Sequence, residues 1–324
     1  MSGKSRIREQ MNRWGEAGVP FLFIIDFEFK KPLLLKLDEI DPRRLLYNIN
    51  GLTNIQDKVL IKKQLRFAKY PVQYEDYLLK FNKIKDEISY GNSYLLNLTC
   101  STPVELNLSL REVFMFSNSR YRIWFEEEFV CFSPEIFVTI RNGRIRSFPM
   151  KGTIDAALPN AEQVILNDYK ETAEHNTIVD LIRNDLSGVS KRVRVERFRY
   201  TDIIETSEKN LLQVSSEISG ELDNDYLSHL GDIIFALLPA GSVSGAPKRK
   251  TTEIIAAVEG CDRGYYTGVA GIFDGQNIDS FVMIRYIEKS AAGYSYRSGG
   301  GITSFSDPAS EYKEMIDKIY VPVV

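Results

Sequence analysis

Lys151 is the residue with the clearest chemical potential, because it stands among apolar residues in the sequence FPMKGT, which begins at Phe148. An amine becomes a nucleophile when burial or a neighbouring charge lowers its pKa. A solvated surface position is the commoner fate of a lysine, and the residues alone leave both interpretations open. A polar turn follows, and Pro159 and Asn160 can begin a long helix that we expect to continue to about Asp185.

The predicted helix of residues 160–185 carries acids on its apolar stripe. At 3.6 residues per turn, one face collects Val164, Asp168, Glu171, His175, Ile178 and Ile182, with Glu174 at its edge. An amphipathic helix ordinarily keeps carboxylates off its apolar face, because an unpaired buried carboxylate is costly. We therefore expect a cation or a very polar cleft to face this part of the helix, close to Lys151.

A second pair of carboxylates occurs near the C-terminus. Glu311 and Glu314 stand three residues apart, so both point to the same side of a helix, and the acidic pair of the central helix has the same spacing. Side chains that offer only oxygen, without a histidine cluster, suit Mg²⁺, Mn²⁺ or Ca²⁺ rather than zinc. Taken alone, however, the second pair lies off the apolar side of its helix and indicates an ordinary surface helix.

Four further features could bind an anion or move a proton. Ser298–Gly301 is glycine-rich, and the backbone N–H groups of such a turn can cradle a carboxylate or phosphate, although a flexible loop fits equally well. Residues 241–248 lead into a helix N-terminus, which also favours anions. Arg285 lies in an apolar stretch predicted as one strand, where it either pairs across a sheet edge or contacts an anion. Glu135 begins a strand and is either a general acid or a solvated side chain.

The composition is that of a soluble globular protein, with 44% hydrophobic and 26% charged residues and a net charge of −3 over 324 residues. A mildly acidic chain argues against nucleic-acid binding. The three cysteines, Cys100, Cys131 and Cys261, form no disulfide framework, which favours a reducing, cytoplasmic compartment. We see no apolar run of 18 residues and no apolar signal region at the N-terminus, so we expect no membrane span.

Strands that come in hairpins must position these residues. Two apolar runs within residues 21–37 and the turn signal Asn142-Gly143 predict antiparallel hairpins. Further strands are expected at 94–100, 191–200, 265–275, 278–289 and 292–301, and helices at 74–90, 223–238, 247–258 and from Asp307 onward. This pattern favours an α+β fold with antiparallel sheets in a single large domain over a parallel doubly wound fold. Residues 1–73 are expected to form a short strand and helix region integrated with the core, and residues 74–324 to carry the motifs.

Seven motifs resemble, in order, those of the chorismate-utilising enzymes. They are PMKGT, YKETAEHNTIVDLIRNDL, LPAGSVSGAPKRKTTEII, YYTGVAG, VMIRY, SGGGIT and SDPASEYKEMIDK, and the resemblance covers roughly residues 74–324. The family includes component I of anthranilate synthase and of aminodeoxychorismate synthase, and the isochorismate and salicylate synthases. The resemblance implies a single α+β domain in which antiparallel sheets pack as a sandwich with flanking helices.

The resemblance also implies roles for the residues that match the motifs. It implies Mg²⁺ held chiefly by Glu174 and Glu314, with Glu171 and Glu311 supporting through water, and with the ring carboxylate of chorismate bound to the metal. It places these residues at the substrate: Tyr266, Arg285, Gly299, Gly300, Gly301, Ser242, Lys248 and His175. By this analogy the C-terminal acidic pair belongs to a site and not to a surface helix.

Position 151 discriminates within the family. Anthranilate synthases resemble PIAGT at this point, whereas aminodeoxychorismate synthases resemble PIKGT with the lysine as nucleophile, and this chain reads PMKGT. The resemblance implies that Lys151 attacks C2 of chorismate while Glu135 protonates the departing C4 hydroxyl. Ammonia then adds at C4 and expels the lysine, which gives 4-amino-4-deoxychorismate. Leu95 stands where isochorismate and salicylate synthases place a base lysine, so we do not expect those activities.

The ammonia must come from another source. No cysteine sits in a glutaminase nucleophile motif, and two histidines leave little for a Cys-His-Glu triad. A separate glutamine amidotransferase subunit is therefore the expected partner, with chorismate as the substrate. Two alternatives stay open: component I of anthranilate synthase, and a non-catalytic chorismate-binding subunit. The second is supported by Leu95 and by Gln213, which aligns with a histidine of many relatives.

Overall fold

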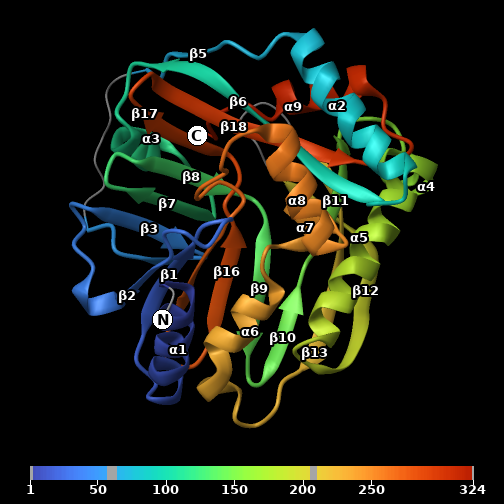
Figure 1. Ribbon diagram of the computed structural model, residues 1–324. Coiled ribbons are helices and arrows are strands. Elements are labelled where there is room, and N and C mark those ends of the chain that lie inside the picture. Colours follow the sequence, from blue (N-terminus) through green and yellow to red (C-terminus); the bar gives the residue numbers. More distant parts are fainter. Residues whose placement is uncertain (1–2, 57–63, 205–209, 323–324) are drawn as a thin grey trace.

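Antiparallel strands dominate the structure, a computed structural model that describes residues 3–56, 64–204 and 210–322. Within these residues the strands form two nine-stranded sheets (Figure 1). The first sheet has the order β11 (Met150–Asp155), β13 (Leu211–Glu221), β10 (Arg144–Ser147), β9 (Ile136–Arg141), β16 (Ile278–Val282), β15 (Val269–Phe273), β1 (Phe21–Ile25) and β2 (Leu33–Lys36), and β12 (Lys191–Ile204) also pairs with β13. The second sheet has the order β14 (Gly245–Ala246), β6 (Leu95–Leu106), β18 (Gly293–Ile302), β17 (Tyr286–Ser290), β8 (Phe129–Ser133), β7 (Tyr121–Phe125), β3 (Leu45–Ile49) and β4 (Leu52–Thr53), and β5 (Phe67–Lys69) also pairs with β6.

Three apolar cores hold these layers together. Side chains of β1, β15 and β16 meet side chains of β3, β7 and β8 in the core between the two sheets. A second core joins the first sheet to α1 (Gly3–Glu16), α5 (Tyr169–Ser187) and α6 (Leu230–Leu237). A third joins the second sheet to α2 (Tyr74–Ser89), α3 (Leu110–Phe116), α8 (Lys248–Glu259) and α9 (Pro308–Asp317). The predicted α+β sandwich with flanking helices in one domain is therefore confirmed.

The N-terminal region contributes to both sheets. Phe21–Ile25 pairs with Val269–Phe273 on one side and with Leu33–Lys36 on the other, which confirms the predicted hairpin. Leu45–Ile49 pairs with Tyr121–Phe125 in the second sheet. The two apolar sides of these strands supply part of the core between the sheets, which explains why strands so early in the chain are almost fully apolar.

The long central helix predicted for residues 160–185 is wrong as a single element. It divides into α4 (Ala161–Asn167) and α5, because Asp168 adopts an extended backbone with φ −66° and ψ 118°. Its side chain then accepts a hydrogen bond from the backbone N–H of Glu171 at 2.9 Å, so Asp168 is the N-cap of α5. Val164 is 53% exposed on α4 and does not share a face with the acids of α5.

The strand predicted for residues 278–289 is also two elements. β16 belongs to the first sheet and β17 to the second, so the chain crosses between the sheets at residues 283–285. Arg285 has a φ of 54°, in the left-handed region that a strand residue does not adopt. Arg285 therefore lies in the crossing and not within a strand.

The glycine-rich stretch before the last helix is neither a turn nor a flexible loop. Gly299, Gly300 and Gly301 belong to β18 and pair with Thr99, Leu98 and Asn97 of β6. A Cβ atom on Gly299 would lie 2.2 Å from the backbone oxygen of Leu98, which only a glycine avoids at this close approach.

One apolar segment, Tyr226–Ser244, has the length and mean hydropathy of a membrane-spanning helix. It is not one continuous helix, because it contains a 3₁₀ turn (Tyr226–His229), α6, and the short α7 (Gly241–Ser244) after the cis peptide Leu238–Pro239. Most of α6 is buried in the core against α1 and the first sheet. Its apolar character is thus explained by burial in the protein.

Candidate active site

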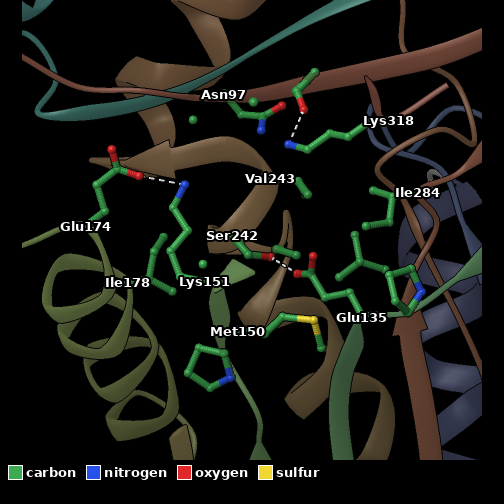
Figure 2. Close-up of a pocket in the computed structure, with 18 of the residues that line it drawn as sticks. Asn97, Glu135, Met150, Lys151, Glu174, Ile178, Ser242, Val243, Ile284 and Lys318 are labelled. Atoms are coloured by element: carbon green, nitrogen blue, oxygen red, sulfur yellow. Dashed lines mark hydrogen bonds and ion pairs between the residues drawn. The ribbon is translucent and has the colours of Figure 1, made fainter. Parts of the chain in front are cut away.

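A cavity of about 1030 Å³ lies where the two sheets and their helices meet. Its walls come from β6, β11, β18, α5, α7 and α9, and from the start of β9. Most of the predicted site residues line it: Glu135, Lys151, Glu171, Glu174, Ser242, Tyr266, Arg285, Gly299, Gly300, Gly301 and Glu314. Figure 2 shows Lys151 and Glu174 on one side of this cavity and Glu135 with Ser242 on another.

A bulge in β11 aims Lys151 at α5. Met150 pairs with Ser215 and Thr153 pairs with Gln213, so one extra residue is inserted between these two pairs. Gly152 has a φ of 81° inside the bulge, and a Cβ atom there would lie 3.0 Å from a carboxylate oxygen of Glu171. The glycine after the lysine is therefore required both by the backbone and by the neighbouring acid.

Lys151 forms an ion pair with an acid of α5. Its Nζ lies 2.6 Å from Oε2 of Glu174, and the two side chains are 24% and 6% exposed. Burial by itself would lower the pKa of the Lys151 amine, but three carboxylates outweigh that effect and raise it: Glu174, Glu314 and Glu171. The alternative of a solvated surface lysine is wrong, and in this state the amine is protonated.

The acids of α5 and α9 converge on this amine. Burial raises the pKa of Glu171, and the neighbouring carboxylates of Glu174 and Glu314 raise it further. Glu311 is 5% exposed and accepts a hydrogen bond from Oγ of Ser306 at 2.8 Å. The interpretation of the last helix, α9, as an ordinary surface helix is therefore wrong, because Glu311 is buried.

Lys318 is a second amine in the cavity, and its role was not predicted. Its Nζ lies 2.7 Å from Glu314 and donates a hydrogen bond to the backbone oxygen of Gly299 at 2.9 Å. Burial lowers the pKa of Lys318 against the effect of Glu314, and the charges of Lys151 and Arg285 lower it further. The i, i+4 pair of Glu314 and Lys318 is visible in the sequence, but that spacing is equally typical of solvated helix surfaces.

Glu135 has the environment of a general acid. Oγ of Ser242, from α7, donates a hydrogen bond to Oε1 of Glu135. Burial raises the pKa of Glu135, although Ser242, Lys318 and Arg285 oppose the shift. A carboxyl group with a raised pKa keeps its proton closer to neutral pH and can donate it to a leaving group.

Arg285 and Tyr266 form the wall next to this acid. The guanidinium of Arg285 lies 5.1 Å from the ring centre of Tyr320. Its Nε is buried and makes no hydrogen bond within the described part of the chain. Tyr266 is 3% exposed and also lines the cavity. Arg285 lines the cavity, and among the described residues the side chains that act most strongly on its charge are tyrosines and not carboxylates, which favours contact with an anion over the alternative of an ion pair across a sheet edge.

Two predicted substrate-binding residues lie elsewhere. His175 is 1% exposed, and its Nε2 lies 2.7 Å from Oγ of Ser216, away from the residues that line the cavity. Burial lowers the pKa of His175 to about 4, so it is neutral. Lys248 pairs with Asp185 at 2.8 Å and donates to the backbone oxygen of Leu237 at 2.6 Å. It joins the start of α8 to the end of α5, and Lys248 itself is not among the residues that line the cavity, although Asp185 is.

The resemblance implies a Mg²⁺ site at the carboxylates of α5 and α9. As the side chains stand, no three histidine, cysteine, aspartate or glutamate residues in the described ranges are arranged to hold a metal ion. Lys151 and Lys318 instead contact Glu174 and Glu314. The oxygen-only donor set nevertheless fits Mg²⁺. A Cβ atom on Gly300 would lie 3.4 Å from a Glu311 oxygen and 3.7 Å from a Glu314 oxygen, so the glycine keeps the space beside these acids clear.

Comparison with known proteins identifies the relatives of this chain. The model of the family described as chorismate binding enzyme matches residues 53–323. An uncharacterised PabA-like protein of Haemophilus influenzae is 46% identical over 97% of this chain and 96% of its own length. Aminodeoxychorismate synthase component 1 of Bacillus subtilis is 32% identical over 74% of this chain, which spans 53% of that relative, and anthranilate synthase component 1 proteins match at comparable identity.

Among solved structures, MenF, the menaquinone-specific isochorismate synthase of Escherichia coli, superposes with a TM-score of 0.73 at 18% identity, covering 97% of this chain and 80% of that one. This likeness concerns the fold alone. The family match covers most of the chain and includes the segments that supply Lys151, the acids of α5 and α9, and Glu135. The chain therefore belongs to the family of chorismate binding enzymes.

Proposed function

We propose that the protein is the chorismate-aminating component of an aminodeoxychorismate synthase, which converts chorismate and ammonia to 4-amino-4-deoxychorismate for p-aminobenzoate and folate synthesis. One observation carries the proposal: the amine of Lys151 faces the cavity, with a protonatable acid, Glu135, also on its wall. A family member that aminates the ring at C2 does not need an amine at this position.

Two residues perform the first step of the proposed reaction. Lys151 loses a proton, for which the nearest oxygen is that of Glu174 at 2.6 Å. The amine then forms a bond to C2 of chorismate, the two ring double bonds shift, and the C4–O bond breaks. Glu135 donates its proton to the leaving hydroxyl, which departs as water. Ser242 holds the carboxyl group of Glu135 in place.

The second step reverses the direction of electron flow. Ammonia forms a bond to C4, the ring double bonds shift back, and the C2–N bond to Lys151 breaks. The amine leaves with a proton that the incoming ammonia gives up, and the pyruvyl ether at C3 is retained. No oxidant or reductant is needed, because an amine has replaced a hydroxyl.

The charged groups of the cavity fit a dianionic substrate. Arg285 and Tyr266 would hold one carboxylate beside the backbone of β18, and Glu174 and Glu314, supported by Glu171 and Glu311, would hold Mg²⁺. When bound, Mg²⁺ supplies a positive charge for the ring carboxylate. Leu95 lines the cavity and offers no base for water, which argues against isochorismate formation.

Ammonia is expected from a separate glutamine amidotransferase subunit, in the cytoplasm. The related synthases named above are components of such two-part enzymes. Cys100 and Cys131 are buried, and only Cys261 is exposed among the cysteines. Free ammonium at high concentration should replace the partner in vitro.

Product analysis tests the proposal. The protein is incubated with chorismate, Mg²⁺ and ¹⁵N-ammonium, and the products are resolved by mass. We expect a ¹⁵N product that retains the pyruvyl group. Anthranilate, which lacks that group, would assign the protein to the anthranilate synthases instead. Chorismate binding without turnover would support the non-catalytic subunit.

A further inference from the structure

The hydroxyl that contacts the proposed general acid comes from a short helix whose backbone lies against α5. Ser242 donates to Glu135 from α7, which has only four residues. A Cβ atom on Gly241 would lie 2.9 Å from a side-chain carbon of Leu181 and 3.0 Å from Oδ2 of Asp185. The missing side chain at Gly241 therefore lets α7 approach α5 closely, next to this acid.

Asp185 is a buried acid of the cavity wall that the proposed reaction does not use. Its side chain is 14% exposed and lines the cavity near the end of α5. Burial raises the pKa of Asp185, although Lys248 opposes the shift. A carboxylate has no proton to donate to the carboxylates of chorismate and repels them, so a contact with these groups does not explain its position. Its contacts are with Lys248 and Gly241 instead.

The partner of Asp185 closes the segment that carries Ser242. Nζ of Lys248, at the start of α8, lies 2.8 Å from Oδ2 of Asp185. The same amine donates to the backbone oxygen of Leu237, at the end of α6, at 2.6 Å. Residues 238–247 connect these two helix ends, and α7, within them, contacts both α5 and α8 (Figure 1). Lys248 therefore joins the two ends of the segment, and Asp185 attaches them to α5.

The part of the segment after Ser242 is held from another side. Nη1 of Arg263, whose side chain is fully buried, donates to the backbone oxygen of Val243 at 2.8 Å. β14 then pairs with β6 of the second sheet. Because these contacts hold the backbone that follows Ser242, the contact of Asp185 with Gly241 holds the backbone that precedes it.

We propose that Asp185 is a positioning residue for the general acid Glu135. Its ion pair with Lys248 holds α7 where the hydroxyl of Ser242 meets the carboxyl group of that acid. The inference rests on the proposed amination, in which Glu135 protonates the leaving hydroxyl. An acid must be oriented toward its leaving group, so displacement of Ser242 should slow this step without weakening the binding of chorismate.

The pH dependence of kcat separates positioning from a direct effect of charge in the Asp185→Asn variant. Activity should fall as pH rises through the pKa of Glu135. Ser242 lowers that pKa, against the larger effect of burial, so displacement of its hydroxyl raises the pKa and moves this alkaline limb to higher pH. The lost negative charge of Asp185 would by itself move the limb to lower pH. Lys318 and Arg285, which also act on the carboxyl group of Glu135, are unchanged in the variant.

The test is steady-state kinetics across pH with chorismate, Mg²⁺ and ammonium, for Asp185→Asn, Ser242→Ala and the double variant. In Asp185→Asn we expect kcat at neutral pH to fall about 10- to 100-fold. KM for chorismate should change less than twofold. The alkaline limb should move to higher pH in both single variants and no further in the double variant, because both substitutions act through one hydrogen bond.

Gly241→Ala is a second variant, because Asp185→Asn removes an ion pair that also stabilises the fold. The added Cβ atom must displace α7 from Leu181 and Asp185 without changing any charge, so the limb should again move to higher pH. Asp279→Asn is the matched control. Asp279 is 15% exposed, pairs with Arg141 and does not line this cavity. The control should leave kcat and the limb unchanged, even where Tm falls.

Three outcomes would overturn the inference. An unmoved limb in Asp185→Asn or in Gly241→Ala would leave the ion pair as a joint between helices only. A limb that moves to lower pH in Asp185→Asn would show a direct effect of charge. A rise in KM for chorismate with an unmoved limb would make Asp185 a substrate contact. Failure of the wild-type protein to incorporate ammonium would contradict the proposed function instead.

Discussion

At the scale of single residues, the protonated amine of Lys151 is held in an ion pair with Glu174 and is not a free base. Its amine must give up a proton before it can attack, and the oxygen of Glu174 at 2.6 Å is the closest group to receive it. The same carboxylate is a proposed metal ligand. Glu174 therefore has two proposed roles, as the proton acceptor for Lys151 and as a ligand of the metal that would bind the substrate carboxylate. The predicted nucleophile and the predicted metal site overlap at this residue.

Glu135 should control the alkaline limb of the activity profile. Burial raises the pKa of Glu135, so the proton needed for the leaving hydroxyl is lost as pH rises through that raised value. We expect kcat of the wild-type protein to fall there. The Glu135→Gln variant should lack this limb and be about 10²- to 10⁴-fold slower. A variant with unchanged kcat and pH profile would remove Glu135 from the mechanism.

The same carboxyl group should also make stability depend on pH. When the pKa of a carboxyl group is higher in the folded protein than in the unfolded chain, the free energy of unfolding falls as pH rises from the unfolded pKa to the folded pKa. Glutamine does not ionise and can still bond to Ser242. Glu135→Gln should therefore match the wild-type Tm below about pH 4 and exceed it near neutral pH, as measured by thermal denaturation across pH.

At the scale of elements, the break at Asp168 determines where the acids of α5 point. The helical period continues through this residue, so periodicity alone cannot reveal that the helix restarts there. The Asp168→Ala variant should lose about 1 kcal/mol of unfolding free energy, since its side chain caps the backbone N–H of Glu171. Asp180→Ala, 82% exposed on the same helix, should change it by less than about 0.5 kcal/mol. Equal effects in urea unfolding would contradict the cap.

The Arg263–Glu259 pair links β6, α7 and α8, and it should be the costliest polar contact to break. Removing the arginine leaves the buried carboxylate of Glu259 without its counter-ion, and the backbone oxygens of Asn97 and Val243 lose the N–H groups that Arg263 donates to them. We expect Arg263→Met to lower the unfolding free energy by about 3–5 kcal/mol. Arg249→Met, which removes a 96% exposed side chain from the same helix region, should cost less than about 1 kcal/mol. If Arg263→Met also lowered the unfolding free energy by less than about 1 kcal/mol, the pair would not be important for the fold.

At the scale of the whole molecule, hairpin turns and some helix starts were predictable because their signals are local. The turn at Asn142-Gly143 and the start of the last helix at Asp307 are examples. In the structure Asp307 is the N-cap of that helix, because its side chain accepts a hydrogen bond from the backbone N–H of Ser310 at 2.9 Å. The crossing at Arg285 was not predictable, because its apolar flanks are typical of one strand. The strand position of Gly299–Gly301 was missed for a similar reason: glycine is typical of turns, and only the partner strand shows that close approach selects it here.

The site was predictable only where motifs supplied long-range information. No local pattern brings Glu174 of α5 to Glu314 of α9, and the resemblance alone predicted their proximity. The resemblance also assigned His175 and Lys248 to the substrate because they match motifs. In the structure these side chains contact other strands and helices. Lys318 was missed because a lysine four residues after a glutamate is equally typical of a solvated helix surface until the opposite wall of the cavity is known.

The most direct test of the whole account is the mass of the protein itself after brief exposure to chorismate and Mg²⁺ without ammonium. We predict a covalent adduct with the mass of chorismate less one water, located by peptide mapping on Lys151. It should be absent in Lys151→Ala, present in Lys83→Ala, whose side chain is exposed on α2, and discharged by ammonium. Formation of aminodeoxychorismate with no adduct, or with the adduct on Lys318, would contradict the account.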